Sequence, residues 1–483
     1  MITELRPIFL IVGLLVALMG VAMIIPAFFD LAAENSDWEV FVFCGVLTTL
    51  VGFGLYSGAR GTQQGLSTRQ AFVMTTIAWL ALVLFGSLPY LLSGVVPTFT
   101  DAFFESMSGL TTTGSTVITG LEFAPPGILL WRGLQQWLGG LGIIVMAVAV
   151  LPMLQVGGMQ LFKVEAFDTS EKIMPRATQI SGSITFVFII ITAMCWIAYM
   201  LAGMGVSDAI IHAMTTVATG GFSSKDASMG FFDNPSIHII AIVFMILGSI
   251  PFILYIQAIQ GQPGKIWGNS QVRVFIYLLL LLTLIAFLLN PGEPGQSNNS
   301  RMLDAAFNVT SIVTGTGYSS TNYGQWSAGA TAFFFCIMFL GGCAGSTSCG
   351  IKIFRFQVMF EAIKQHLSRV FYPNGVFVMR FNDAPIDESV ATAVMNFFAI
   401  YFLLFGIFAI ALNMTGLDFL TSMSAAGTAI SNVGPGLGDT IGPAGTFKEL
   451  NDTAKWILIG AMLVGRLELF TVLVLFVPRF WRV

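Results

Sequence analysis

The chain repeats one short glycine-containing tract four times, at Thr111-Thr112-Thr113-Gly114-Ser115, Ala218-Thr219-Gly220-Gly221-Phe222, Thr314-Gly315-Thr316-Gly317-Tyr318 and Ser431-Asn432-Val433-Gly434-Pro435. Each tract follows a short amphipathic stretch and precedes an apolar span. Asp101, Asp208 and Asp304 lie 13 residues before the key glycine of the first three tracts, and Asp418 lies 16 residues before Gly434. We expect each of these aspartates to cap a half-helix. Four copies of helix, half-helix, tract and helix are what a four-fold pore requires.

The composition indicates an all-α integral membrane protein. Of the 483 residues, 55% are hydrophobic and only 10% are charged, whereas about 25% are charged in soluble domains. A helix needs roughly 20 apolar residues to cross the hydrocarbon. Such spans are predicted to begin near Phe9, Val40, Phe72, Leu129, Ile184, Ile237, Val274, Ala330, Val390 and Trp456. The first is too long for the apolar core of a signal peptide and has no cleavage site, so we interpret it as a retained helix.

The lysines and arginines fall mostly on the side of the N-terminus, which predicts that both termini are cytoplasmic. All four tracts then open to the outside. The predicted organisation is an N-terminal hairpin over 1–66 and four pore repeats over 67–179, 180–267, 268–384 and 385–483. All four repeats have the same orientation, which favours a single pore along the membrane normal. Inverted repeats would instead favour a rocking carrier.

Threonine and glycine suit an ion-selectivity filter, because glycine reaches backbone angles closed to other residues. Rings of carbonyl oxygens can then replace the hydration shell of K⁺. The alternative is that these small residues only let helices pack closely. Four tracts at equivalent positions favour the filter, whose predicted K⁺-binding residues are Thr111, Thr112, Thr113, Gly114, Thr219, Gly220, Gly221, Gly315, Thr316, Gly317, Asn432, Val433 and Gly434.

Other functional classes have less support in the sequence. The five cysteines show no disulfide pattern, and the three histidines are too far apart to suggest a metal site. The sequence contains no nucleotide-binding motif, and nothing indicates a nucleic-acid partner. Gly436-Leu437-Gly438-Asp439 matches the motif of intramembrane aspartyl proteases, but no apolar span supplies the second aspartate that such an enzyme needs.

The chain resembles the Trk/Ktr/HKT superfamily of potassium transporters, and within it the bacterial TrkH type. The motifs that carry the resemblance run over 110–115, 218–223, 341–347, 432–436 and 462–468. The resemblance implies K⁺ uptake across the bacterial inner membrane, with Rb⁺ as a substitute ion and no covalently bound cofactor. It also implies a homodimer and a cytosolic TrkA-like nucleotide-binding ring as partners. Some plant relatives with serine at the position of Gly114 favour Na⁺, so this glycine favours K⁺.

The stretch Gly341-Gly342-Cys343-Ala344-Gly345-Ser346-Thr347-Ser348-Cys349-Gly350 is too rich in glycine for a straight helix. The resemblance implies that it is an intramembrane gate loop below the filter. The alternative is a kinked helix without a gating role. Many relatives have glycine where this chain has Cys349, whose side chain could stiffen the loop. The predicted gate residues are Gly341, Gly342, Gly345, Ser346, Gly350, Lys352 and Arg466.

Arg466 lies near the middle of the apolar run 456–477. Charges at that depth are costly and usually face a cavity or a partner. The resemblance implies that Arg466 points into the pore, where its charge would oppose cations. The alternative is an ion pair with another helix.

The basic, amphipathic stretch 354–387 is either a cytoplasmic anchor or a docking surface for a cytosolic subunit. A second function remains open, in which the same scaffold carries K⁺ together with Na⁺ or H⁺. No carboxylate is evident within a span near the filter, and this disfavours coupling to H⁺.

Overall fold

The computed structural model describes residues 5–61, 67–146, 177–292, 294–382 and 384–482. The end of the predicted hairpin (62–66) and residues 147–176 of the predicted first repeat lie outside them. The helices are α1 Arg6–Ala22, α2 Ile24–Ala32, α3 Trp38–Gly58, α4 Thr68–Leu92, α5 Phe99–Leu110, η1 Leu121–Phe123, α6 Pro126–Val145, α9 Ala177–Leu201, α10 Val206–Val217, η3 Ser228–Phe231, α11 Pro235–Gly248, α12 Phe252–Ile259, α13 Gly264–Gly268, α14 Ser270–Leu289, α15 Asn298–Thr314, η4 Tyr323–Gln325, α16 Ala328–Ile337, α17 Ile353–Phe371, α18 Glu388–Asn413, α19 Phe419–Ser431, α20 Asp452–Arg466, α21 Phe470–Leu473, η5 Val474–Phe476 and α22 Pro478–Trp481. Strands β1 Arg380–Phe381 and β2 Ala384–Pro385 form the one sheet of the described part.

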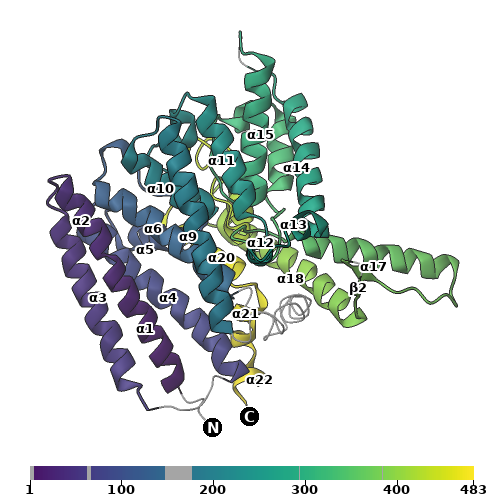
Figure 1. Ribbon diagram of the computed structural model, residues 1–483, viewed down its shortest axis with the longest axis horizontal. Helices are drawn as coiled ribbons and strands as arrows, with labels where there is room; N and C mark the ends of the chain where they lie inside the picture. The colour runs from purple at the N-terminus through teal and green to yellow at the C-terminus, as the bar shows by residue number, and fades with distance from the viewer. Residues whose placement is uncertain (1–4, 62–66, 147–176, 293, 383, 483) are drawn as a thin grey trace.

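The same unit occurs four times: a long helix, a short half-helix and a returning helix. The units are α4–α5–α6, α9–α10–α11, α14–α15–α16 and α18–α19–α20. Helices α1, α2 and α3 form a hairpin at one edge of the molecule, beside α4 (Figure 1). The predicted fold class, an all-α membrane protein with four repeats and an N-terminal hairpin, is therefore confirmed.

The four units close into a ring. Helix α6 packs on α10, α11 packs on α15, and α20 packs back on α5. The remaining junction brings Gly427 of α19 against Met338 and Phe339, which follow α16. Each repeat therefore contacts the next, and the fourth contacts the first.

Three of the ten continuous spans that the sequence predicts are interrupted in the described structure. In the described part of the chain, seven helices are long and apolar enough to cross a membrane. Among the described residues, the predicted spans that begin near Ile237 and Trp456 are bent pairs, with angles of 90° at α11/α12 and 108° between α20 and the segment Phe470–Phe476. The span predicted near Ala330 is the ten-residue helix α16 followed by an irregular loop. Hydropathy does not detect the breaks after α11 and α20, because only three residues separate the two helices of each pair and the window average stays high.

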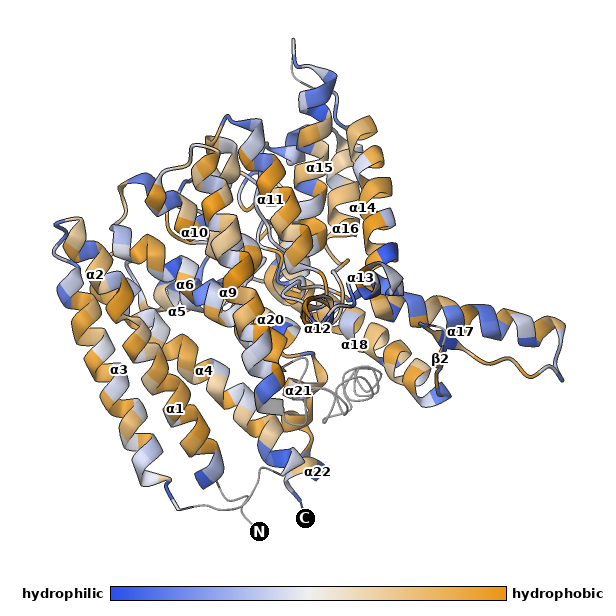
Figure 2. Ribbon diagram, in the orientation of Figure 1, coloured by the Kyte–Doolittle hydropathy of each residue, from blue (hydrophilic) through white to orange (hydrophobic). Residues whose placement is uncertain are grey.

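The long helices consist mostly of hydrophobic residues, as the colouring of Figure 2 shows for α1, α3 and α14. Leu18, Leu50 and Leu280 are each more than half exposed. Such surfaces match a lipid environment. The first residues of α1 and helix α22 lie at the same end of the molecule, and Phe480 packs on Phe72 of α4 with ring centroids 6.3 Å apart (Figure 1).

The aspartates do not cap the half-helices as predicted, with one exception. Thr98 caps α5 by accepting a hydrogen bond from the Asp101 amide, and Gly205 and Ser297 precede α10 and α15. Asp101 and Asp208 lie in the first turn, and Asp304 lies within the longer helix α15. Asp418 alone is an N-cap, accepting from the Thr421 amide at 3.1 Å. Hydrogen bonds from the Thr421 side chain and amide hold the pKa of Asp418 below its usual value.

Glycines in the N-terminal hairpin serve helix packing. Gly13 and Gly20 of α1 and Gly52 of α3 lie so close to the facing helix that an added Cβ would fall within 3.0 Å of its backbone. Small residues at such positions let helix axes approach and increase van der Waals contact. In this hairpin, small residues therefore allow the helices to pack closely.

This packing predicts that Gly52→Leu destabilises the hairpin. The new side chain would meet the backbone of Ala17, whereas Gly54, two residues along the same helix, has open space around its Cα. Overpacking costs typically about 1–3 kcal/mol. Thermal unfolding of the purified protein in detergent should show a lower midpoint for Gly52→Leu and an unchanged one for the control Gly54→Leu. Equal midpoints for the two variants would contradict close packing at Gly52.

Candidate ion-selectivity filter and intramembrane gate

The four key glycines form a closed ring of backbone contacts. Gly114, Gly221, Gly317 and Gly434 all have positive φ, at 86°, 80°, 82° and 111°. A Cβ added to any of them would lie within 3.0 Å of a carbonyl oxygen in the next tract, namely those of Gly220, Thr316, Val433 and Thr113 in turn. Each of those carbonyls belongs to the residue just before the next key glycine. The contacts therefore run from the first repeat to the second, third and fourth, and back to the first.

The residue two positions before each key glycine also has positive φ. These residues are Thr112, Thr219, Gly315 and Asn432, with φ of 53°, 48°, 75° and 52°. Left-handed backbone is uncommon outside glycine and costs about 1–3 kcal/mol where it is held. All four tracts therefore share one unusual backbone shape, although their sequences differ. The structure brings all thirteen predicted filter residues together in this ring.

Side chains hold the tracts in this shape. The hydroxyl oxygens of Thr111 and Thr113 lie 2.7 Å apart, as do those of Thr314 and Thr316. Asn432 donates to the Thr113 hydroxyl at 3.0 Å, which joins the fourth tract to the first. The threonines of the tracts are buried, while Gly114, Gly221 and Gly317 are partly exposed.

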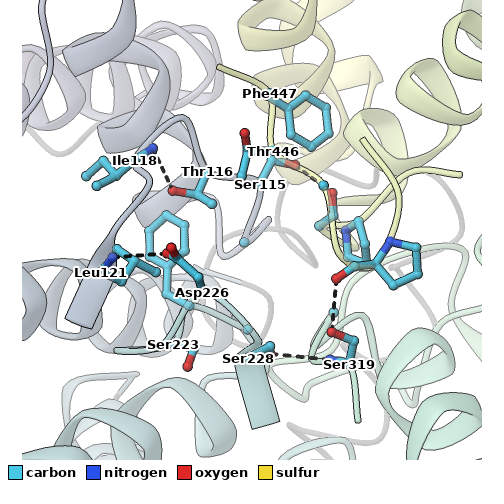
Figure 3. Close-up of a pocket in the computed structure, with 18 of the residues that line it drawn as sticks. Ser115, Thr116, Ile118, Leu121, Ser223, Asp226, Ser228, Ser319, Thr446 and Phe447 are labelled. Atoms are coloured by element: carbon cyan, nitrogen blue, oxygen red, sulfur yellow. Dashed lines mark hydrogen bonds between the residues drawn. The ribbon is translucent and has the colours of Figure 1, made fainter. Parts of the chain in front are cut away.

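An outer vestibule opens above the ring, and all four repeats line it (Figure 3). Hydrogen bonds cross each junction between repeats: Leu121 N to Asp226 Oδ1 at 3.0 Å, Ser319 N to Ser228 Oγ at 3.3 Å, Ser319 Oγ to Pro443 O at 3.1 Å, and Ser115 Oγ to Gly434 O at 2.7 Å. Through these hydrogen bonds, the rim of the vestibule joins the four repeats to one another.

The segment 341–350 lies against the inner ends of all four tracts. Cys349 Sγ is 3.4 Å from Thr112 Oγ1, and the Thr347 and Thr219 hydroxyls are 3.1 Å apart. Ser348 Oγ donates to Thr314 O at 2.7 Å, and the Gly350 amide donates to Ser431 O at 2.9 Å. One short segment thus contacts each of the four repeats beneath the ring.

This segment is an irregular loop whose two ends lie together. Leu340 and Ile351 form a parallel bridge, and the Gly341 amide donates to Ile351 O at 2.9 Å. Within the loop, the Gly342 amide donates to Ser348 Oγ at 2.7 Å, and Ser346 Oγ donates to Cys343 O at 2.6 Å. Gly345 and Gly350 have positive φ. The stretch is not a kinked helix, since no helical residue is present between α16 and α17.

Arg466 ends α20 directly beneath this loop. Its guanidinium lies 2.8 Å from Cys349 Sγ, 3.5 Å from Thr347 O and 3.4 Å from Gly139 O. No carboxylate of the described residues lies within ion-pairing distance of it. The structural ion pair offered as the alternative role of Arg466 is therefore absent from the described part.

Two neighbouring cations have different surroundings. Lys352 caps the start of α17 and donates to Ser348 O, so it lies with the other predicted gate residues. Arg355, buried one turn later, pairs with Glu468 and stacks on the Phe397 ring at 3.7 Å. Glu468, two residues after Arg466 in the sequence, therefore neutralises Arg355 and not Arg466.

Sequence reasoning missed a buried ion pair behind the ring. Glu105 of α5 accepts from Arg132 Nε at 2.8 Å and from the Val117 amide at 2.9 Å. Arg132 also donates to Ser223 O at 2.7 Å. Both side chains are almost fully buried. The prediction that no carboxylate lies within a span near the filter did not extend to Glu105, which is on the half-helix α5; isolated charges in apolar surroundings were the available signal.

Gln136, one turn further along α6, links the first repeat to the second tract. Its side chain donates to Gly220 O at 2.5 Å and accepts from the Phe222 amide at 3.0 Å. It is fully buried, so both bonds are shielded from water. Nothing in the local sequence around Gln136 distinguishes this role, because its partners lie more than 80 residues away.

A ring of four backbone tracts at the centre of apolar helical repeats is typical of membrane transport proteins. A family model described as "Cation transport protein", TrkH, matches residues 39–294 and 295–483. The chain belongs to the TrkH family.

Individual relatives match along most of their length. The chain is 45% identical to the Trk system potassium uptake protein TrkI of Halomonas elongata, over 86% of this chain and 84% of the relative. It is 37% identical to the Trk system potassium uptake protein TrkH of Escherichia coli K12, over 99% of both chains. The crystal structure of the potassium transporter TrkH from Vibrio parahaemolyticus superposes with a TM-score of 0.91, at 36% identity, over 99% of this chain and 100% of that one. These relatives are transporters, and the chain is not an enzyme.

Proposed function

We propose that this protein takes up K⁺ through a filter built from the four tracts. The observation that carries the proposal is the ring of four positive-φ glycines, each packed against a carbonyl of the next tract. Backbone oxygens held around one centre can replace the water shell of K⁺. The relatives are potassium uptake proteins by name, which supports K⁺ as the transported ion.

The half-helices favour a cation at this centre. Helices α5, α10, α15 and α19 all end at a tract, so their C-terminal ends converge on the ring. A helix C-terminus carries a partial negative charge of about half an elementary charge. Four such ends together lower the energy of a partly dehydrated K⁺. No resident cofactor is needed for this function, because the ion itself is the cargo.

The loop 341–350, with Lys352 and Arg466, acts in this proposal as the gate. It contacts all four tracts, and its ends are joined, so it can move as one unit while α16 and α17 stay in place. The positive charge of Arg466, which has no carboxylate partner in the described part of the chain, faces the loop and opposes K⁺ on the inner side.

Regulation from the cytoplasm fits helix α17. It projects from the body of the molecule and carries exposed apolar side chains such as Phe360 and Phe371 beside basic ones (Figure 1). A second copy of the chain and a TrkA-like nucleotide-binding ring are the partners that we propose. The proposed site is the bacterial inner membrane, with both termini in the cytoplasm.

Passive conduction is preferred over coupled transport with Na⁺ or H⁺. The carboxylate nearest the ring, Glu105, is paired with Arg132 and accepts two further protein donors. It is therefore not a free proton relay. A reversal potential that follows the K⁺ gradient alone supports conduction, whereas one that shifts with Na⁺ or pH supports coupling.

The first prediction concerns the selectivity of the ring. In Gly114→Ser, the side chain meets the Gly220 carbonyl at a residue with φ of 86°, so the ring should distort and admit more Na⁺. The measurement is the ratio of ⁸⁶Rb⁺ to ²²Na⁺ flux into vesicles that hold the purified protein, with a several-fold drop expected. Gly460→Ser, where nothing lies within 4 Å of the added Cβ, is the matched control. An unchanged ratio in Gly114→Ser would remove this residue from the filter.

The second prediction concerns the loop. Deleting residues 343–349 should raise basal K⁺ flux, because Leu340 and Ile351 already lie side by side and the shortened chain can close without displacing α16 or α17. Flux is measured in vesicles without any cytosolic partner, and thermal unfolding reports whether the variant is folded. A folded deletion variant that conducts no faster than the parent protein would show that the loop is not a barrier.

The third prediction compares two buried arginines. Arg466→Ala should raise K⁺ flux, since two unit charges 4 Å apart repel by about 4 kcal/mol at an effective dielectric of 20. Arg466→Lys should resemble the parent protein, because the charge is kept. Arg355→Ala instead leaves Glu468 unpaired and should lower stability, by less than the about 3–5 kcal/mol lost on breaking a fully buried pair, because Glu468 is partly exposed. A well-folded Arg466→Ala protein with flux at or below that of the parent would refute the barrier.

A further inference from the structure

A polar cavity of about 210 Å³ lies in the third repeat, against residues 321 and 322 of the loop that follows the tract. It is bounded by the end of α14, the first half of α15 and the η4 turn, through residues that include Asn290, Gln296, Asp304, Asn322, Gln325 and Trp326. Asp304 is its one charged side chain among the described residues, and no lysine or arginine lines it. The proposed function makes no use of this cavity.

Comparison of the repeats shows what is unusual about Asp304. Its counterparts in the first two repeats have a cationic partner, with Lys455 Nζ 2.7 Å from Asp101 and Lys225 Nζ 3.4 Å from Asp208. The fourth, Asp418, is exposed and caps its helix. Asp304 is only 7% exposed, and no lysine or arginine of the described chain lies within 4.0 Å of it. It is therefore a buried carboxylate without a protein counter-charge.

Neutral groups bind both oxygens of this carboxylate. Gln296 Nε2 donates to one oxygen at 2.7 Å, and Ser320 Oγ donates to the other at 3.1 Å. Arg301 lies one turn earlier on α15, but its guanidinium binds Asn298 Oδ1 and Asn290 O and lies over the Phe287 ring. Two neutral hydrogen bonds offset only part of the cost of burying a charge, so a cation from outside would stabilise the site.

We infer that this cavity binds a partly hydrated alkali-metal cation, K⁺ under uptake conditions, through the Asp304 carboxylate. Oxygen atoms are the ligands that such hard cations take, and Asn290, Asn322 and Gln325 supply amide oxygens around the cavity. The described residues contain no group of three or more His, Cys, Asp or Glu side chains that could hold a metal. A single carboxylate with neutral oxygens therefore suits a monovalent ion better than a divalent one.

The cavity provides a staging position, where K⁺ is held before it enters the filter. This inference rests on the proposed uptake of K⁺. Ser320, which donates to Asp304, directly follows Ser319 of the vestibule lining. A cation held there is close to the opening through which ions reach the ring. Local accumulation of the substrate ion raises its capture rate at low external concentration.

The direct test is anomalous diffraction from crystals of the full protein grown in Rb⁺. We expect one Rb⁺ peak in the cavity beside the Asp304 carboxylate, in addition to peaks at the ring, and we expect Asp304→Asn to lose only the cavity peak. Occupied ring positions with an empty cavity in the parent protein would overturn the staging site and leave the proposed filter intact. An empty ring would instead count against the filter.

Transport kinetics give the second measurement. Asp304→Asn should raise the KM for ⁸⁶Rb⁺ uptake about three- to tenfold with an unchanged maximal rate, and Asp304→Glu should restore most of the affinity. Asp233→Asn, which removes an exposed outer carboxylate, is the matched control and should leave KM unchanged. A lower maximal rate at constant KM, with a reduced melting midpoint, would assign Asp304 a purely structural role and overturn the inference.

Discussion

The close approach of four glycine residues to four carbonyl oxygens is the constraint on which the rest of the structure depends. At each of the four positions a Cβ would collide with the backbone of the adjacent repeat. The half-helices must therefore end at one depth, and the repeats must pack closely enough for backbones to touch. The hydrogen bonds of the vestibule rim and the buried side chains of Gln136 and Asn432 hold the repeats at that separation.

Buried charges around this centre fall into two kinds. Glu105 with Arg132, and Arg355 with Glu468, are paired inside the protein and fix one element against another. Arg466 and Asp304 have no partner of opposite charge in the described part. Paired charges contribute little field at a distance, whereas unpaired ones act on any ion nearby. The unpaired positive charge lies against the loop 341–350, whereas the unpaired negative charge binds Ser320, which follows Ser319 of the vestibule lining.

Sequence patterns were sufficient for the four repeats, because each tract combines glycine with an apolar span on either side and the pattern occurs four times. They were insufficient for the breaks after α11 and α20, since hydropathy averages over the few residues where a helix ends. The break after α16 was predicted, because 341–350 is too rich in glycine for a straight helix. The prediction that the aspartates cap the half-helices was wrong for the first three of them. Thr98 and Ser297 take the capping positions, and the first two aspartates bind lysines from other parts of the chain. Glu105 and Arg132 could not be paired from sequence, because 27 residues and a tract separate them.

The contact between the fourth tract and the first has a consequence for how the protein is made. Asn432 binds Thr113, and these residues are 319 positions apart. Synthesis proceeds from the N-terminus at about 5–20 residues per second, so the last repeat follows the first after tens of seconds. Until α19 and α20 are inserted, the ring lacks one side and α5 lacks one of the helices that pack on it. No partial product of translation therefore has all four tracts, so the filter that we propose forms only when the last repeat is in place.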